Sequence, residues 1–139
     1  MRLRDELLDL TMANAPTAVR QVALSSGRDL DATLAFWTDC LGLPLHARFD
    51  PPGMAFIVVG GVRMFFADAF PPGTVYLDIP DIDTFCAEAM RRGAAFTALP
   101  AMMHHDRDGQ FGPAGEQEWM AFLKDPGGNT IGLVERKPG

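Results

Sequence analysis

The sequence has few cysteines, no basic cluster and no long apolar run, and each absence excludes a class of protein. Only two cysteines, Cys40 and Cys86, occur among the 139 residues, and both fall within apolar patterns of helical spacing. A small secreted domain that depends on disulfides carries more cysteines for its size. We therefore expect two reduced cysteines that pack as small core side chains.

Lysine and arginine form no cluster, and acidic residues outnumber them by 18 to 12, which gives a formal net charge of -6. A polyanion would be repelled by such a surface, so we expect no nucleic-acid partner. No apolar run approaches the roughly 20 residues that cross a bilayer. The first ten residues contain Asp5, Glu6 and Asp9, where a signal peptide would be apolar. We expect a cytoplasmic protein with no membrane partner.

The length and the hydrophobic content of 47% suit one domain with a buried core. Leu3, Leu7 and Leu8, with acidic residues between them, have the spacing of a short amphipathic helix. We assign residues 1–15 to an N-terminal helical extension. Residues 16–139 are assigned to a single domain.

Residues 18–69 contain the pattern of a strand, a helix and three further strands. Residues 19–25 alternate with the period of a half-buried strand, and Asp29 is a suitable N-cap for a helix that Gly42 ends. The Gly60-Gly61 pair indicates a tight hairpin between the last two strands. The three strand candidates after the helix are Leu45–Phe49, Met54–Val59 and Val62–Ala67.

The same order of elements restarts after residue 71 and continues to residue 136. Residues 74–79 alternate like a strand, and Asp81 precedes a helical pattern that Gly93 ends. The following strand candidates are Phe96–Met103, Gln117–Lys124 and Thr130–Glu135. The two modules, 18–69 and 72–136, are best explained as an internal repeat. In the second module, a polar, glycine-rich loop at 104–116 has a length that is often functional.

Two motifs resemble those of the vicinal oxygen chelate superfamily, which contains glyoxalases, bleomycin resistance proteins and extradiol dioxygenases. They are Asp29-Leu30-Asp31 through Phe36-Trp37 to Leu41-Gly42-Leu43, and Asp125-Pro126-Gly127-Gly128-Asn129-Thr130-Ile131. Such helix stops and turns indicate a fold and not a reaction. The resemblance implies an α+β fold in which two tandem βαβββ modules form a cupped, incomplete-barrel mixed sheet. It also implies helices outside the cup, a small-molecule ligand inside it, and a homodimer.

Metal-dependent members of that superfamily carry up to four His, Glu or Gln ligands on the first and last strand of each module. Counted from the helix caps and the glycine turns, those positions are Gln21, Phe65, Thr74 and Gly132. Only Gln21 could ligate a metal, whereas a catalytic zinc or iron site takes three strong protein ligands. A shift of one residue restores no carboxylate on either last strand. We predict no metal and no other cofactor.

The cup face of these strands should carry an amphipathic lining. The side chains that we assign to the ligand are Gln21, Arg63, Phe65, Thr74, Tyr76, Asp78, Trp119 and Gly132. Phe65 and Tyr76 could sandwich a flat ligand, and Arg63 could hold an anionic group. An ion pair between Arg63 and Asp78 fits the sequence equally well. Trp119 suits either the core or a stacking surface.

The candidates for catalysis are His104, His105 and Glu118. A histidine pair beside Asp106 could provide a general base or a displaced metal ligand at the rim of the cup. The alternative is a solvated loop, and Glu118 is either an acid-base carboxylate or a solvated residue near a strand end.

The missing ligands favour a metal-free small-molecule binding protein of the glyoxalase/bleomycin-resistance type. Its ligand would be partly aromatic, with an anionic group as an option. The alternative is a glyoxalase-like lyase or isomerase with an atypical or absent metal site, and a third option is a partner-binding module that uses the N-terminal helix. A histidine and a carboxylate that converge on the cavity would favour the enzyme, whereas an aromatic-lined cup without such a pair would favour the binding protein.

Overall fold

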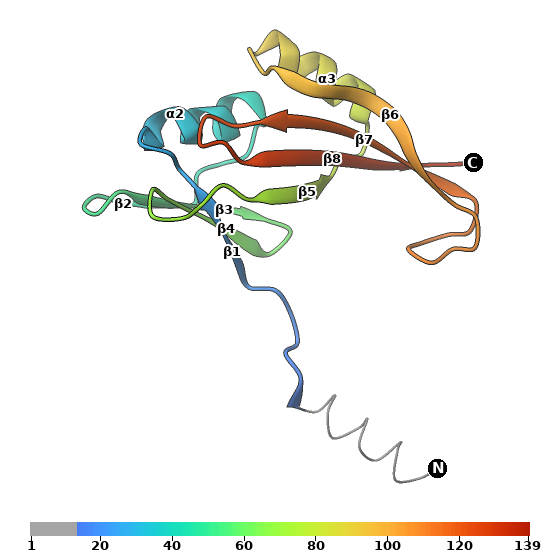
Figure 1. Cartoon of the computed structure of the whole chain (residues 1–139), viewed down its shortest axis with the longest axis horizontal. Coiled ribbons are helices and arrows are strands. Elements are labelled where there is room, and N and C mark those ends of the chain that lie inside the picture. Colours follow the sequence, from blue (N-terminus) through green and yellow to red (C-terminus); the bar gives the residue numbers. More distant parts are fainter. Residues whose placement is uncertain (1–13) are drawn as a thin grey trace.

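The chain folds into two consecutive units with the same order of elements, which the computed structural model describes over residues 14–139 (Figure 1). The first unit consists of β1 (Gln21–Ser25), α2 (Leu30–Ala35), the π-helical segment η1 (Phe36–Cys40), β2 (Ala47–Phe49), β3 (Met54–Val59) and β4 (Val62–Ala67). The second unit consists of β5 (Thr74–Asp78), α3 (Ile82–Arg91), β6 (Phe96–Asp106), β7 (Glu116–Lys124) and β8 (Thr130–Lys137). The predicted βαβββ repeat is confirmed. The predicted N-terminal helix falls mainly on residues 1–13, which lie outside the described part of the chain.

Each unit forms its own four-stranded mixed sheet. Sheet A has the strand order β1-β4-β3-β2, and sheet B has the order β5-β8-β7-β6. In both sheets the first strand of the unit runs parallel to the last, and the other neighbours are antiparallel. Within the described residues neither sheet closes into a barrel, so β1 and β5 remain at sheet edges. This open α+β arrangement is the cupped fold that the sequence predicts.

The two faces of each sheet differ in burial. Side chains alternate across a strand, so every second residue belongs to the same face. On the helix-packed face, Ile57, Phe66 and Leu133 are almost completely buried and share one core with α2, η1 and α3. On the opposite face, which we call the cup face, Phe65 is partly covered and Tyr76 is exposed. Figure 1 shows α2 and α3 on the same side of the molecule, in the upper part of the view.

Each helix begins at the aspartate that the sequence predicts as its N-cap. The Asp29 side chain accepts a hydrogen bond from the Ala32 N–H at 3.0 Å, and Asp81 accepts one from the Thr84 N–H at 3.2 Å. The first helix does not stay regular to its end. In η1 the helix widens, and the N–H of the C-cap residue Leu41 donates five residues back, to the carbonyl of Phe36.

A buried polar cluster around Asn129 ties the two units together. The Oδ1 atom of Asn129 accepts hydrogen bonds from the N–H groups of Ser25 at 3.0 Å and Gly73 at 2.9 Å. Its Nδ2 atom donates to the Ser25 carbonyl at 2.7 Å. Asp125 accepts from the same Nδ2 and from the indole N–H of Trp37, each at 2.8 Å. The turn motif between β7 and β8 therefore also joins the end of β1 to the start of β5.

Most predicted element boundaries agree with the structure to within two residues, but the loop predicted over 104–116 is shorter than expected. Pairing between β6 and β7 continues to Asp106 opposite Glu116, so His104 and His105 are strand residues. Only residues 107–115 connect the two strands.

Both cysteines are free. Over residues 14–139, no helix has the length and apolarity that a bilayer crossing requires.

Candidate functional site

Aromatic side chains cover much of the cup face of sheet A. Phe56 of β3 lies opposite Phe65 of β4, and the two rings stack with centroids 4.6 Å apart and planes 22° apart. Phe70 packs edge-on against Phe65 at 4.9 Å, and Phe49 packs edge-on against Phe56 at 6.1 Å. None of the four rings is fully buried. The cup face of this sheet therefore presents a preformed aromatic surface to a flat ligand.

Arg63 lies at the edge of this aromatic surface, in a hollow of about 260 Å³. The residues that line the hollow are His46, Ala47, Phe49, Phe56 and Arg63. The Nε atom of Arg63 is buried and has no hydrogen-bond partner within residues 14–139. The same part of the chain contains no ion pair between Arg63 and a carboxylate, so the alternative of an Arg63–Asp78 pair is not observed there. Among the described residues, the hollow thus holds a cation without a carboxylate partner beside aromatic rings.

On the cup face of sheet B, Tyr76 lies across Gly132. The two residues are neighbours in the parallel pairing of β5 with β8. A Cβ atom added to Gly132 would lie 2.6 Å from Cδ2 of the Tyr76 ring, so glycine is needed for this position of the ring. Tyr76 also packs edge-on against Phe122 at 5.9 Å. Each of Phe65 and Tyr76 therefore stacks or packs within its own sheet, and the predicted pair is not in ring contact.

The four positions at which the resemblance leads us to expect metal ligands do not provide a metal-binding set here. Gln21 and Thr74 are exposed, Phe65 is part of the aromatic surface, and Gly132 is covered by Tyr76. Phenylalanine and glycine offer no side-chain atom that could coordinate a metal, and amide and hydroxyl oxygens are weak ligands for zinc or iron. In the described residues no group of three or more His, Cys, Asp or Glu side chains is placed to hold a metal ion. The residues at the four expected positions do not fit a catalytic metal.

The predicted histidine pair is divided between the two faces of sheet B. His104 pairs with Glu118 and shares the cup face with it, whereas His105 pairs with Gln117 on the helix-packed face. The His104 ring packs edge-on against Phe111 at 5.8 Å, and its Nε2 is buried without a hydrogen-bond partner in residues 14–139. The structure brings His104 and Glu118 opposite each other, but it does not join them by a hydrogen bond.

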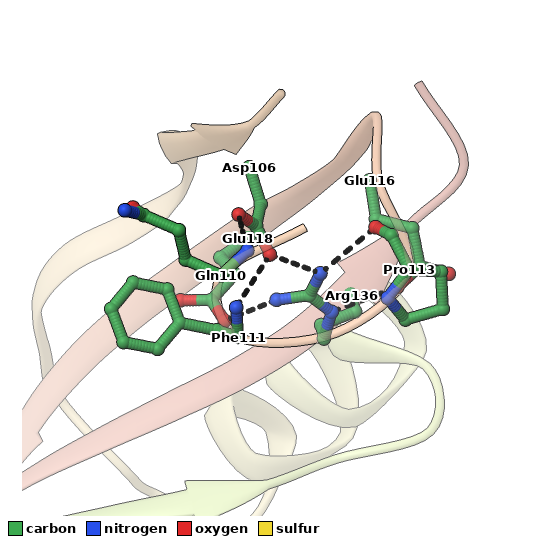
Figure 2. A network of polar contacts seen from close by, with 7 residues as sticks. All are labelled: Asp106, Gln110, Phe111, Pro113, Glu116, Glu118 and Arg136. Carbon is green, nitrogen blue, oxygen red and sulfur yellow. Dashed lines mark hydrogen bonds and ion pairs between the residues drawn. The ribbon is translucent and has the colours of Figure 1, made fainter. Parts of the chain in front are cut away.

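Glu118 belongs instead to a cluster of three carboxylates around Arg136 (Figure 2). The guanidinium of Arg136 contacts Asp106 at 2.9 Å, Glu116 at 2.8 Å and Glu118 at 2.7 Å. Burial disfavours the ionised form of Asp106, but hydrogen bonds from Arg136 and from the backbone N–H of Phe111 outweigh it, and the pKa falls to about 2. The pKa of Arg136 is raised, mainly by its hydrogen bonds to Glu116 and Asp106. Asp106 and Arg136 therefore stay ionised at neutral pH, and their contact closes the β6–β7 loop, which is a structural role.

Trp119 lies on the helix-packed face, where it packs partly buried against the core. Its indole N–H donates to Gln117 at 3.1 Å, and Lys137 lies 4.6 Å above its ring. It therefore does not belong to the cup lining predicted for it. Asp78 is exposed and lines a different pocket, at the junction of the two units.

Of the residues that line the Arg63 hollow, the sequence predicts only Arg63, and it does not predict His46, Ala47, Phe49 or Phe56. The sequence does contain a signal that places Phe56 on the aromatic surface. The Gly60-Gly61 turn places Val59 opposite Val62, and counting back along both strands places Phe56 opposite Phe65. No comparable signal marks His46, because it lies in the loop before β2.

Comparison with protein families gives one match over most of the chain. The family model described as the Glyoxalase/Bleomycin resistance protein/Dioxygenase superfamily matches residues 21–133. No curated protein sequence gives a significant match.

Solved structures from the same group share the fold. A lactoylglutathione lyase from Agrobacterium tumefaciens is 20% identical, with a TM-score of 0.68 over 88% of this chain and 96% of the other. A glyoxalase/bleomycin resistance protein/dioxygenase from Nocardioides is 20% identical, with a TM-score of 0.67 over 98% and 97%. TnmS3, an antibiotic binding protein from Streptomyces sp. CB03234, is 21% identical, with a TM-score of 0.68 over 88% and 98%. At these identities the likeness concerns the fold alone.

Proposed function

We propose, on the premise that this chain belongs to the Glyoxalase/Bleomycin resistance protein/Dioxygenase superfamily, that it binds a small organic molecule without using a metal. The ligand is a flat, partly aromatic molecule with an anionic group. The observation that carries this proposal is the Arg63 guanidinium beside the stacked Phe56 and Phe65 rings, whose buried Nε has no partner in the described part of the chain.

Arg63 has no carboxylate partner among residues 14–139, and this needs a physical explanation. The protein has a formal charge of -6, so carboxylates are abundant. Buried polar atoms are almost always hydrogen-bonded, so each exception calls for an explanation, such as a functional role or a bound ion or water. The planar fork of a guanidinium matches a carboxylate through two parallel hydrogen bonds. A bound anion would supply the partner that Nε lacks.

The size of the hollow limits the part of the ligand that it can enclose. Its volume of about 260 Å³ lies just below the usual range for ligand pockets, which begins at about 300 Å³. We therefore assign to it the anionic group and one ring of the ligand. Gln21, Thr74, Tyr76 and Gly132 remain the proposed lining for the rest of the molecule.

A homodimer is part of the proposal. Phe49 and Tyr76 are exposed by 48% and 56%, although both are large apolar side chains on cup faces. A second copy that covered these rings would remove apolar surface from water and would enclose the ligand more completely.

The alternative, a glyoxalase-like lyase or isomerase, depends on His104 as a general base. Its buried Nε2 has no hydrogen-bond partner among the residues that the structure describes, which is the observation in favour of this alternative. Glu118, the carboxylate opposite His104, is already engaged by Arg136.

The TnmS3 neighbour is named an antibiotic binding protein, which is consistent with the binding proposal.

Replacement of Phe65 by alanine tests the aromatic surface, with 2-naphthoate as a flat anionic probe. We expect the dissociation constant to increase about 3- to 10-fold, because loss of a ring contact removes about 0.5–1.5 kcal/mol beyond burial. Isothermal titration calorimetry would measure the affinity, and far-UV circular dichroism would check the fold.

Phe65→Leu is the matched control, since it keeps apolar bulk but removes the aromatic face. Its affinity should fall nearly as far as that of Phe65→Ala. An unchanged affinity in a folded Phe65→Ala protein would contradict the proposed position of the ligand.

A further inference from the structure

His46 is the second polar side chain in the lining of the Arg63 hollow, and the other lining residues of the described chain are alanine and phenylalanine. The His46 side chain is exposed. Within residues 14–139 its imidazole forms no hydrogen bond, no ion pair and no ring contact. The hollow therefore presents two different hydrogen-bonding groups to a ligand, the guanidinium of Arg63 and the imidazole of His46.

The backbone explains why His46 lies on the cup side of sheet A. Ala47 is the partner of Phe56 in the antiparallel pairing of β2 with β3, so strict alternation would place the preceding residue on the helix-packed face. The N–H of His46 nevertheless donates to the carbonyl of the same Phe56, at 2.9 Å. Two consecutive residues thus lie opposite one, which is the arrangement of a β-bulge. Such a bulge re-aims a side chain, and here it brings His46 to the hollow.

The small volume of the hollow determines which part of a ligand His46 can contact. About 260 Å³ admits the anionic group of the ligand and one ring. A ligand that places its anion on Arg63 and this ring against Phe56 has only the substituents of that ring beside His46. A substituent on a second ring would lie outside the hollow.

We propose that His46 determines the specificity of the hollow and that the ligand is an aromatic hydroxy acid, with its hydroxyl next to the acid group on the same ring. This inference rests on the binding function assigned to Arg63, which would hold the carboxylate. A hydroxyl suits the second position because it can accept from the ring N–H of a neutral imidazole or donate to its other nitrogen. The alanine and phenylalanine side chains of the lining offer a hydroxyl no such partner.

The expected gain from this contact is moderate. His46 is exposed, so its hydrogen bond to the ligand replaces a hydrogen bond to water. One net hydrogen bond contributes about 0.5–1.5 kcal/mol, which corresponds to an affinity about 2- to 10-fold higher. His46 therefore selects among aromatic acids, whereas Arg63 provides most of the affinity for the anion.

The test compares three acids by isothermal titration calorimetry with the full-length protein. 3-Hydroxy-2-naphthoate has its hydroxyl beside the carboxylate, 6-hydroxy-2-naphthoate has it on the second ring, and 2-naphthoate has none. We expect the 3-hydroxy acid to bind about 2- to 10-fold more tightly than 2-naphthoate. The 6-hydroxy acid should bind like 2-naphthoate, because its hydroxyl remains outside the hollow.

Variants of His46 assign the preference to the imidazole. His46→Phe keeps a ring but has no hydrogen-bonding atom, so the two affinities should become equal. His46→Asn keeps one donor and one acceptor and should retain part of the preference. Both variants preserve the backbone N–H that bonds to Phe56. Because the readout is a ratio of two affinities, any effect of His46 on the carboxylate that both acids share cancels.

Arg48→Leu is the matched control. Arg48 lies two residues away on the helix-packed face, where it pairs with the buried Ala55 and its guanidinium contacts Asp31 at 2.6 Å. This substitution also removes hydrogen-bond donors from β2, but it should leave the ratio of the two affinities unchanged.

Three results would overturn the proposal while the binding function of Arg63 stands. They are equal affinities of 2-naphthoate and 3-hydroxy-2-naphthoate for the wild-type protein, an undiminished preference in His46→Phe, and an equal gain from the 6-hydroxyl. In each case Arg63→Leu would still weaken both acids. If neither acid bound, or if Arg63→Leu weakened neither, the binding function itself would be wrong and this inference would be wrong with it.

Discussion

Replacing Asn129 with alanine is expected to lower the free energy of unfolding by about 3–5 kcal/mol. The side chain is completely buried and bonds three backbone groups from two different units, the N–H and C=O of Ser25 and the N–H of Gly73. Alanine would leave these groups buried without partners, and each unsatisfied group costs about 1–3 kcal/mol. It would also remove one of the hydrogen bonds to Asp125. Urea denaturation followed by circular dichroism would measure the change.

Gln117→Ala is a suitable control for the Asn129 variant. Gln117 also makes a side-chain hydrogen bond, to Trp119, but it is only partly buried and joins residues of one strand. Its loss should cost less than about 1 kcal/mol. If Asn129→Ala cost no more than this control, the two units would have to be held together mainly by their shared apolar core.

Replacing Arg63 with leucine is expected to raise the dissociation constant for 2-naphthoate about 10- to 100-fold. Hydrogen bonds to charged groups contribute about 1.5–3 kcal/mol, and leucine retains much of the apolar stem of arginine while removing the charge and the donors. The fold should survive, because no ion pair or Nε hydrogen bond within residues 14–139 depends on this guanidinium. Isothermal titration calorimetry would measure the affinity.

The neutral probe 2-naphthylmethanol separates charge recognition from general apolar binding. Its affinity should be almost the same for the wild-type protein and for Arg63→Leu, because it has no anionic group. Arg63→Lys should give an intermediate affinity for 2-naphthoate, since it keeps the charge but not the planar fork. Equal losses for both probes in Arg63→Leu would mean that the substitution damages the hollow and does not remove an anion contact.

The repeated fold was predictable because its signals are local and occur twice. Asp29 and Asp81 cap helices at equivalent places, and paired glycines set the β3–β4 register. The end of β6 was not predictable in this way. His104 and His105 were assigned to a loop because they are polar and precede a glycine, but the pairing of β6 with β7 and the buried Asp106–Arg136 contact extend the strand past them.

The candidate site was only partly predictable, because a site depends on contacts between distant residues. Alternation places Phe65 and Tyr76 on cup faces, yet it does not reveal that Phe65 stacks on Phe56 and Tyr76 on Gly132. Alternation should also have placed Trp119 with Ala121 and Leu123 on the buried face of β7. The role of Asn129 as a bridge between strand edges required the three-dimensional arrangement.

Native mass spectrometry of freshly purified full-length protein, combined with elemental analysis, tests the metal-free binding proposal most directly. We predict a dimer mass, an organic molecule retained at the cup, and zinc, iron, nickel or manganese far below one atom per chain. Stoichiometric divalent metal that remains bound after dialysis, with no retained organic molecule, would contradict the proposal.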